Sequence, residues 1–181
     1  LNKSEFPRAG YVGRLEPKKN VINLAKAFEG LDLELEIVGE GSLREELEAT
    51  AKNARLNLLL RGQMANSMLA KFYQSLSFYV QPSHLEHHPK TLIEAMACGL
   101  PVIASNRKGN RELIQNMRTG ILCETDSSSI RKSIVWILEH PEEATELGSN
   151  ARQFVADNFS METVLKAEIK LLKRIATTVD H

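Results

Sequence analysis

Two carboxylates that stand eight residues apart are the strongest candidates for chemistry in this chain. Glu86 lies in a short segment bounded by Pro82 and Pro89, and Glu94 lies in the apolar stretch that follows. An ionised carboxylate only accepts hydrogen bonds, and its two oxygens match the paired hydroxyls of a vicinal diol. A sugar nucleotide carries one diol at each end, so the pair suggests a ligand of that chemistry. Glu94 alone is equally explained as a favourable charge near a helix start.

A cationic loop near the amino terminus is the second candidate. Arg14, Lys18 and Lys19 stand directly before an expected helix, whose free amide groups favour an anion. An Arg guanidinium offers a planar fork to phosphate oxygens, and a Lys ammonium offers a mobile point charge. The loop is therefore suited to hold a diphosphate and to stabilise it as it leaves. A solvated basic turn would contain the same residues, so both interpretations stay open.

A pair of glycines, Gly39 and Gly41, follows a strand and precedes a helix, as in the phosphate-binding turn of dinucleotide-binding proteins. The third glycine of that pattern is replaced here by Arg44, and the turn follows the second strand instead of the first. A tight turn without a ligand explains the glycines equally well. An NAD-type site is thus an alternative supported by this pair alone.

Three histidines, His84, His87 and His88, crowd the segment around Glu86 and raise the question of a metal site. The H-x-E spacing imitates zinc deaminases, but Cys98 stands alone where those enzymes need two cysteines. The H-E-x-x-H zinc pattern is absent as well. We therefore favour polar loop residues over a metal site. A glycosidase would also use two acids, but the cationic loop indicates phosphate instead.

The elements that must position these residues alternate along the whole chain, with short apolar strands followed by amphipathic helices. We expect strands at 9–12, 33–38, 56–60, 77–81, 102–104 and 120–123, and helices at 21–28, 43–54, 67–74, 92–97, 130–138, 142–157 and 161–176. This pattern predicts a single α/β domain over 1–181, a doubly wound, Rossmann-like parallel sheet of about six strands with a C-terminal helical extension. Ligands bind at the carboxyl ends of such strands, where the candidate loops fall. Serines at 127–129 are suited to cap the first helix of the extension.

Composition excludes several classes of function. Lys plus Arg and Asp plus Glu number 23 each, so no overall positive field favours nucleic acid and no polybasic stretch favours a membrane surface. No apolar run approaches the roughly 18–20 residues of a membrane span. Cys98 and Cys123 stand among small or apolar residues, which favours buried thiols in a reducing cytoplasm. Because residue 1 is Leu, we interpret the amino terminus as a cut through a longer protein.

Taken together, these motifs resemble the C-terminal domain of family 4 glycosyltransferases of the GT-B architecture. The G-R-L pattern with its later Lys lies at 13–19, the G-x-G turn at 39–41, and the block P-S-x-x-E-x7-E-A-M-A-x-G-x-P-V-I-A-S at 82–105. Gly109, Glu112 and Gly120 follow where the family has its G-x-x-E and late glycine. The chain departs from the family at His87 and His88, where Gly and an apolar residue are common, and at Lys90, where a small or polar residue is frequent.

The resemblance implies binding of a nucleotide-diphosphate sugar, a UDP- or GDP-hexose. Arg14 and Lys19 would grip the diphosphate, Glu86 would hold the sugar hydroxyls, and Glu94 would bind the ribose. The amides of Thr91 and Leu92 would meet phosphate, and the loop from Gly62 to Met64 would lie beside the base. The implied catalytic residues are Arg14, Lys19 and Glu86, and the implied donor-binding residues are Gly13, Arg14, Lys19, Gly39, Gly41, Met64, Glu86, His87, His88, Lys90, Thr91, Leu92 and Glu94.

The resemblance also implies retention of the anomeric configuration, no metal or other cofactor, and an acceptor site on an N-terminal domain that this chain lacks. The isolated chain would then bind the donor but transfer no sugar. The whole hexosyltransferase would be cytoplasmic, with peripheral membrane association if the missing half provides it, and would bind no nucleic acid. Three alternatives stay open: a sugar-nucleotide epimerase, a non-catalytic nucleotide-binding module and an NAD-dependent oxidoreductase.

Overall fold

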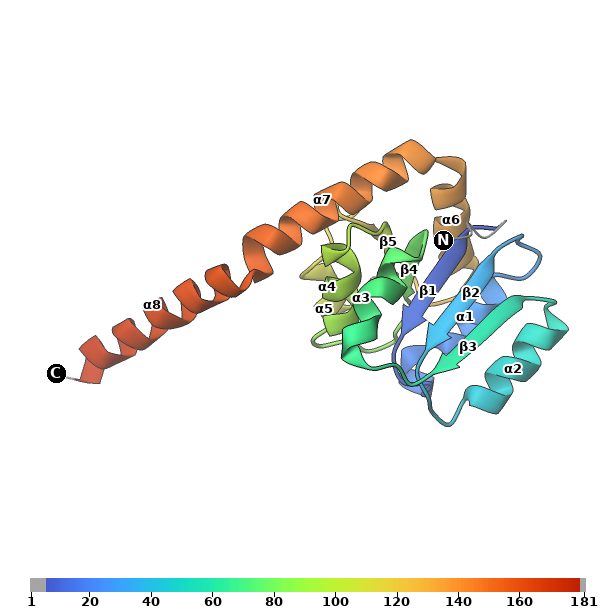
Figure 1. The fold of residues 1–181 in the computed structure, drawn as a ribbon, viewed down its shortest axis with the longest axis horizontal. Helices are drawn as coiled ribbons and strands as arrows, with labels where there is room; N and C mark the ends of the chain where they lie inside the picture. The colour runs from blue at the N-terminus through green and yellow to red at the C-terminus, as the bar shows by residue number, and fades with distance from the viewer. Residues whose placement is uncertain (1–5, 180–181) are drawn as a thin grey trace.

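A computed structural model describes residues 6–179, which form one six-stranded parallel sheet with helices on both faces (Figure 1). The strands are β1 (Arg8–Val12), β2 (Glu34–Val38), β3 (Asn57–Gly62), β4 (Phe78–Gln81), β5 (Val102–Ser105) and β6 (Ile121–Cys123). Their order is β3-β2-β1-β4-β5-β6, and every neighbouring pair is parallel. The strand order reverses between β1 and β4. The predicted fold class is confirmed, with small shifts at the strand ends.

Helices cover the two faces of this sheet. α1 (Val21–Ala27), α2 (Arg44–Asn53) and α6 (Ser127–Glu139) contribute to the apolar cluster on one face. α3 (Asn66–Gln74) and α4 (Lys90–Ala97) pack on the other face, together with the second half of α7 (Pro141–Phe159). Two further helices are α5 (Lys108–Arg111) and α8 (Met161–Val179).

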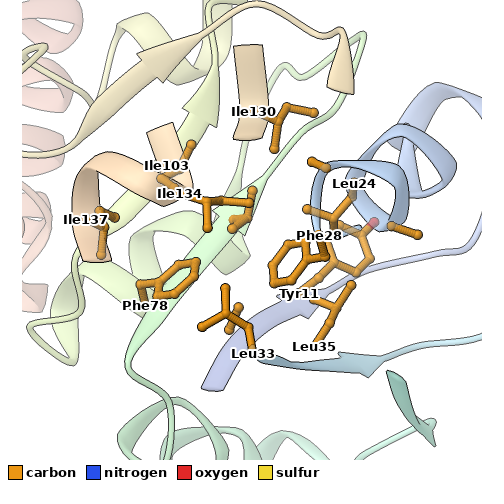
Figure 2. Close-up of a cluster of buried hydrophobic side chains, with 14 of the residues drawn as sticks. Tyr11, Leu24, Phe28, Leu33, Leu35, Phe78, Ile103, Ile130, Ile134 and Ile137 are labelled. Carbon is orange, nitrogen blue, oxygen red and sulfur yellow. The ribbon is translucent and has the colours of Figure 1, made fainter. Parts of the chain in front are cut away.

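The alternation of side chains along the strands explains why both faces are covered. Tyr11 and Ile37 belong to the cluster under α1 and α6, whereas their neighbours Val12 and Val38 belong to the cluster under α3 and α4. Figure 2 shows the first cluster, in which aromatic and aliphatic side chains of strands and helices converge. Full burial of each such side chain is worth about 1.5–3 kcal/mol. Because both faces are buried, the sheet is a rigid base for the loops at its edge.

Three local details differ from the sequence prediction. The single turns of α5 and of the 3-10 helix Pro17–Lys19 were not predicted, because one turn is too short to show helical periodicity. The cap of α6 is not one of the serines at 127–129: the Asp126 carboxylate accepts a hydrogen bond from the Ser129 amide at 2.8 Å. α4 begins at Lys90, so Glu94 lies in the second turn and not in the first.

The C-terminal helix α8 extends away from the sheet (Figure 1). Leu165, Ile169 and Leu172, which form an apolar row at helical spacing, are all exposed. The chain turns at Ser160, whose backbone is extended, and the Ser160 hydroxyl accepts a hydrogen bond from the Thr163 amide. No helix in residues 6–179 is long and apolar enough to cross a membrane.

Candidate functional site

An open pocket of about 340 Å³ lies at the carboxyl ends of β1 and β2, beside the point where the strand order reverses. Such a position is where ligands bind in open α/β sheets. The loops after β1, β2 and β3 form one side of it, and α4 forms the other. Its lining residues are Val12, Gly13, Arg14, Val38, Gly39, Glu40, Gln63, Met64, Asn66, Leu69, Lys90, Thr91 and Glu94.

Glycines let the loops after β1 and β2 pack directly against each other under this pocket. A Cβ atom on Gly39 would lie 1.9 Å from the Gly13 carbonyl oxygen, and one on Gly41 would lie 2.4 Å from the Leu15 carbonyl oxygen. Gly39 also has a φ of +143°, which side-chain-bearing residues rarely adopt. The Gly13 amide completes the contact by donating to Val38. The G-x-G turn is therefore explained by loop packing, whether or not its glycines also touch a ligand.

Glu94 lies on the α4 wall of the pocket with one fixed oxygen. The Tyr73 hydroxyl, which α3 contributes, donates to Glu94 Oε2 at 3.0 Å, and Lys90 Nζ lies 3.5 Å from Oε1. Burial, and then the nearby Tyr79 and Glu94, raise the pKa of Tyr73 far above its ordinary value. Tyr73 therefore stays protonated and acts as a donor. Lys90 is exposed, and its 3.5 Å ion pair with Glu94 Oε1 is longer than the Tyr73 hydrogen bond to Oε2.

Glu86 is almost buried and carries two strong partners on the same oxygen. Lys19 Nζ lies 2.7 Å from Glu86 Oε2, and Gln81 Nε2 donates to that oxygen at 3.0 Å. The exposed fractions are 17% for the Lys19 side chain and 9% for Glu86. No hydrogen bond to Glu86 Oε1 is found among the described residues. The two predicted catalytic groups thus lie in contact, with one carboxylate oxygen left for a ligand.

A chain of buried hydrogen bonds connects the ion pair to the pocket. The Tyr79 hydroxyl lies 2.7 Å from Gln81 Oε1 and 3.0 Å from Thr91 Oγ1. Thr91 lines the pocket, and Gln81 contacts Glu86. Because Tyr79 and Gln81 are buried in β4, the two ends of the candidate site are fixed relative to each other through the sheet.

The backbone of the Glu86 segment is held from both sides. The His84 amide donates to the Lys18 carbonyl at 2.9 Å, and the Gly109 amide at the start of α5 donates to the Glu86 carbonyl at 3.2 Å. A Cβ atom on Gly109 would lie only 2.6 Å from that same carbonyl oxygen. Glycine at 109 therefore permits the close contact that sets the position of Glu86.

The structure separates the predicted site residues into two groups. The pocket itself brings together Gly13, Arg14, Gly39, Met64, Lys90, Thr91 and Glu94. Lys19, Gly41, Glu86, His87, His88 and Leu92 do not line it. His87 and His88 are exposed, and Leu92 is fully buried, with its amide donating to the Pro89 carbonyl within the first turn of α4. Arg14 is 66% exposed and pairs with Glu16 at 2.9 Å.

Several residues of the site escaped the sequence prediction. Tyr73, Tyr79 and Gln81 support the two carboxylates, and Glu40, Asn66 and Leu69 also line the pocket. Only Gln81 left a signal, because it is the single polar residue at the end of the otherwise apolar strand Phe78–Gln81. The tyrosines are indistinguishable in sequence from ordinary core aromatics.

The described thiols and histidines form no larger cluster. Cys98 and Cys123 are both free; Cys123 is buried as predicted, whereas Cys98 is partly exposed. Within residues 6–179, no group of three or more His, Cys, Asp or Glu side chains is arranged to hold a metal ion.

Comparisons with known proteins agree with this geometry. The family described as glycosyl transferases group 1 matches residues 1–154. A GDP-mannose-dependent alpha-mannosyltransferase of Mycolicibacterium smegmatis is 39% identical over 120 residues, which are 66% of this chain and 31% of that protein. The structure of sucrose-phosphate synthase from Thermosynechococcus elongatus superposes with a TM-score of 0.88 at 29% identity, covering 96% of this chain and 46% of that one.

A third match, Anabaena HepE in complex with UDP, has a TM-score of 0.85 at 21% identity and shares the fold over 93% of this chain and 49% of that one. The chain therefore spans between about a third and a half of the length of these proteins. With a parallel six-stranded sheet, a pocket at its point of reversal and a family match over most of its length, the chain belongs to the group 1 family of glycosyltransferases.

Proposed function

We propose that this chain is the donor-binding domain of a retaining hexosyltransferase and that it binds a UDP- or GDP-hexose. The observation that carries the proposal is that Glu94 lies on the wall of the pocket, while Glu86 begins a hydrogen-bond chain through Gln81 and Tyr79 that reaches the same pocket at Thr91. Glu94 lines a pocket at the position where ligands bind in open α/β sheets. Glu86 lies beside Lys19, and its Oε1 has no hydrogen-bond partner among the described residues. Two acceptors held apart by a rigid strand suit the two diols of a sugar nucleotide.

In this proposal the nucleoside occupies the pocket. Met64 contacts the base, Glu94 accepts hydrogen bonds from the ribose hydroxyls, and Glu86 accepts them from the hexose. Arg14 and Lys19 hold the diphosphate. Lys19 has three N–H donors, so it can keep its bond to Glu86 and still reach a phosphate oxygen.

The chemistry required of these residues is the stabilisation of a leaving group. The bond between the anomeric carbon of the hexose and a diphosphate oxygen breaks, and a bond forms from that carbon to an acceptor oxygen, which loses its proton. Negative charge develops on the departing diphosphate. The cations of Arg14 and Lys19 stabilise that charge without a metal ion.

The relatives support the donor class and leave the base undecided. One is named for its dependence on GDP-mannose, and another was solved with UDP. Membership of the family does not support the epimerase and oxidoreductase alternatives. Because the chain spans at most about half of these proteins, we propose that an N-terminal half supplies the acceptor site and that α8 contacts this half. This chain alone then binds the donor without transferring sugar. We propose a cytoplasmic location for the whole protein.

Calorimetric titration of the purified chain with nucleoside, nucleoside diphosphate and nucleotide-sugar tests the assignment. Each hydrogen bond to a charged group is worth about 1.5–3 kcal/mol, or roughly tenfold to a hundredfold in affinity. Glu94→Gln should weaken the nucleoside diphosphate and the nucleotide-sugar alike, and Glu86→Gln should weaken only the nucleotide-sugar. Glu40→Gln changes the other carboxylate that lines the pocket beside Glu94 and should weaken neither ligand. Equal losses for both ligands in Glu86→Gln would refute its assignment to the sugar.

A further inference from the structure

Gln81 is a buried amide whose two ends contact two different parts of the candidate site. It is the last residue of β4 and is 2% exposed. Its Nε2 donates to Glu86 Oε2 at 3.0 Å, and its Oε1 lies 2.7 Å from the Tyr79 hydroxyl and 3.4 Å from Thr91 Oγ1.

The charge of Glu86 fixes the orientation of the Gln81 amide. An ionised carboxylate only accepts, so Gln81 must turn its NH₂ group toward Glu86 and its carbonyl oxygen toward Tyr79. Complete burial raises the pKa of Tyr79 far above its ordinary value, so the hydroxyl keeps its proton. It donates a hydrogen bond to Gln81 Oε1 at 2.7 Å. A reversed amide would place its carbonyl oxygen against the carboxylate, which is repulsive.

The two donors to Glu86 converge on a single oxygen. Lys19 Nζ and Gln81 Nε2 both contact Oε2, and no partner of Oε1 is found in the part of the chain that the structure describes. A carboxylate held at one oxygen by an amide from a buried strand cannot rotate freely. The other oxygen is therefore presented in a fixed direction.

We propose that Gln81 is a positioning residue for the hexose end of the donor: by holding Glu86 Oε2, and with its own amide oriented by Tyr79, it leaves Oε1 aimed at the sugar hydroxyls. This inference rests on the proposed function. It assigns Gln81 no contact with the ligand, and it assigns the nearby Tyr73 the corresponding task for Glu94 at the ribose end.

The test is the ratio of two affinities, measured by calorimetry on the purified chain with a nucleoside diphosphate and with its nucleotide-sugar. Gln81→Met removes the amide at nearly the same length and should weaken the nucleotide-sugar about tenfold while leaving the nucleoside diphosphate unchanged. Gln81→Glu places a second carboxylate against Glu86 and should cause a larger loss in the same ligand. Tyr79→Phe removes only the hydroxyl that orients Gln81 and should change the ratio in the same direction by less.

Tyr73→Phe is the matched control, because Tyr73 and Tyr79 are both buried and their rings lie 5.7 Å apart. Its lost hydroxyl contacts Glu94, so both ligands should weaken together and the ratio should stay constant. A purely structural role of Gln81 predicts equal losses of both ligands in Gln81→Met, and that result would overturn the inference. If Gln81→Met does not fold, Tyr79→Phe decides by the same ratio. Failure of the unaltered chain to bind any nucleotide-sugar would instead overturn the proposed function, and the inference with it.

Discussion

The ion pair between Lys19 and Glu86 should contribute measurably to the stability of the fold. Its atoms are 2.7 Å apart, and the side chains are 17% and 9% exposed. At an effective dielectric constant of about 20, two unit charges at this distance attract by roughly 6 kcal/mol. Most of that is offset by the cost of removing both groups from water, which leaves a net coupling of about 2 kcal/mol, as for hydrogen bonds between charged groups.

A double-mutant cycle isolates this coupling. Lys19→Met and Glu86→Gln keep the side-chain lengths and remove one charge each, and urea unfolding of the two single variants and the double variant gives their free energies of unfolding. Lys19→Met should be the most destabilised, because it leaves the Glu86 charge buried with only Gln81 as partner. The double variant should recover part of that loss.

The pair of Arg14 and Glu16 provides the control at nearly the same distance. Its atoms are 2.9 Å apart, but its side chains are 66% and 28% exposed. Exposed pairs are worth at most about 1 kcal/mol, so the same cycle with Arg14→Met and Glu16→Gln should give a small coupling that falls further with salt. If both cycles give equal couplings below about 1 kcal/mol, burial does not strengthen the Lys19–Glu86 pair and the reasoning is refuted.

Four further substitutions test the loops and the core by unfolding. Gly39→Ala should destabilise the chain by about 2–3 kcal/mol, because its Cβ would overlap the Gly13 carbonyl oxygen at a φ of +143°. Gly30→Ala is the control: Gly30 has a φ of +67° and open space around it, so the change should cost only about 1 kcal/mol. Equal losses of stability in the two variants would contradict this reasoning. Asp126→Ala should cost about 1 kcal/mol through loss of the α6 cap, and an unchanged unfolding midpoint would refute the cap. Burial raises the pKa of Cys123 from 9.0 to about 12, so the unfolded state loses a proton above pH 9 that the folded state keeps. Stability should therefore be intact below pH 9 and fall by about 1.4 kcal/mol by pH 10, and Cys123→Ala should lack this component of the decline; the same pH dependence in both proteins would contradict the assignment.

The sequence predicts the sheet well because strands buried on both faces are short apolar runs between turn residues. The strand Phe78–Gln81 and the helix Lys90–Ala97 were found from that pattern with errors of one or two residues. Helix ends were less accurate, because caps depend on local side-chain bonds: Asp126 caps α6 although three serines follow it. The short α5 has no period to detect, yet Gly109 within it fixes the Glu86 backbone.

The candidate site, too, was predictable from the sequence only in part. The types and spacing of Glu86 and Glu94 were enough to single them out from the sequence. Their supports were not predictable, because only the fold brings the Tyr73 hydroxyl to Glu94, and the Tyr79 hydroxyl to the Gln81 amide that contacts Glu86. Nor does spacing reveal that Lys19 and Glu86, separated by 67 positions, form one ion pair.

The reversal of strand order also bears on how the chain folds. β1 pairs with β4 through Ala9 and Phe78, and the Arg8 amide donates to the Ser77 hydroxyl across 69 positions of sequence. Such a distant pairing requires closure of a long loop, and contacts of this kind slow folding. On either side of the reversal, β1 pairs with β2 and β4 pairs with β5, which are closer in sequence, so these pairs can form first. The two walls of the pocket meet only after β1 joins β4, so we expect the pocket to be completed late in folding. We therefore expect a bound nucleotide to slow unfolding of the chain while leaving its folding rate unchanged.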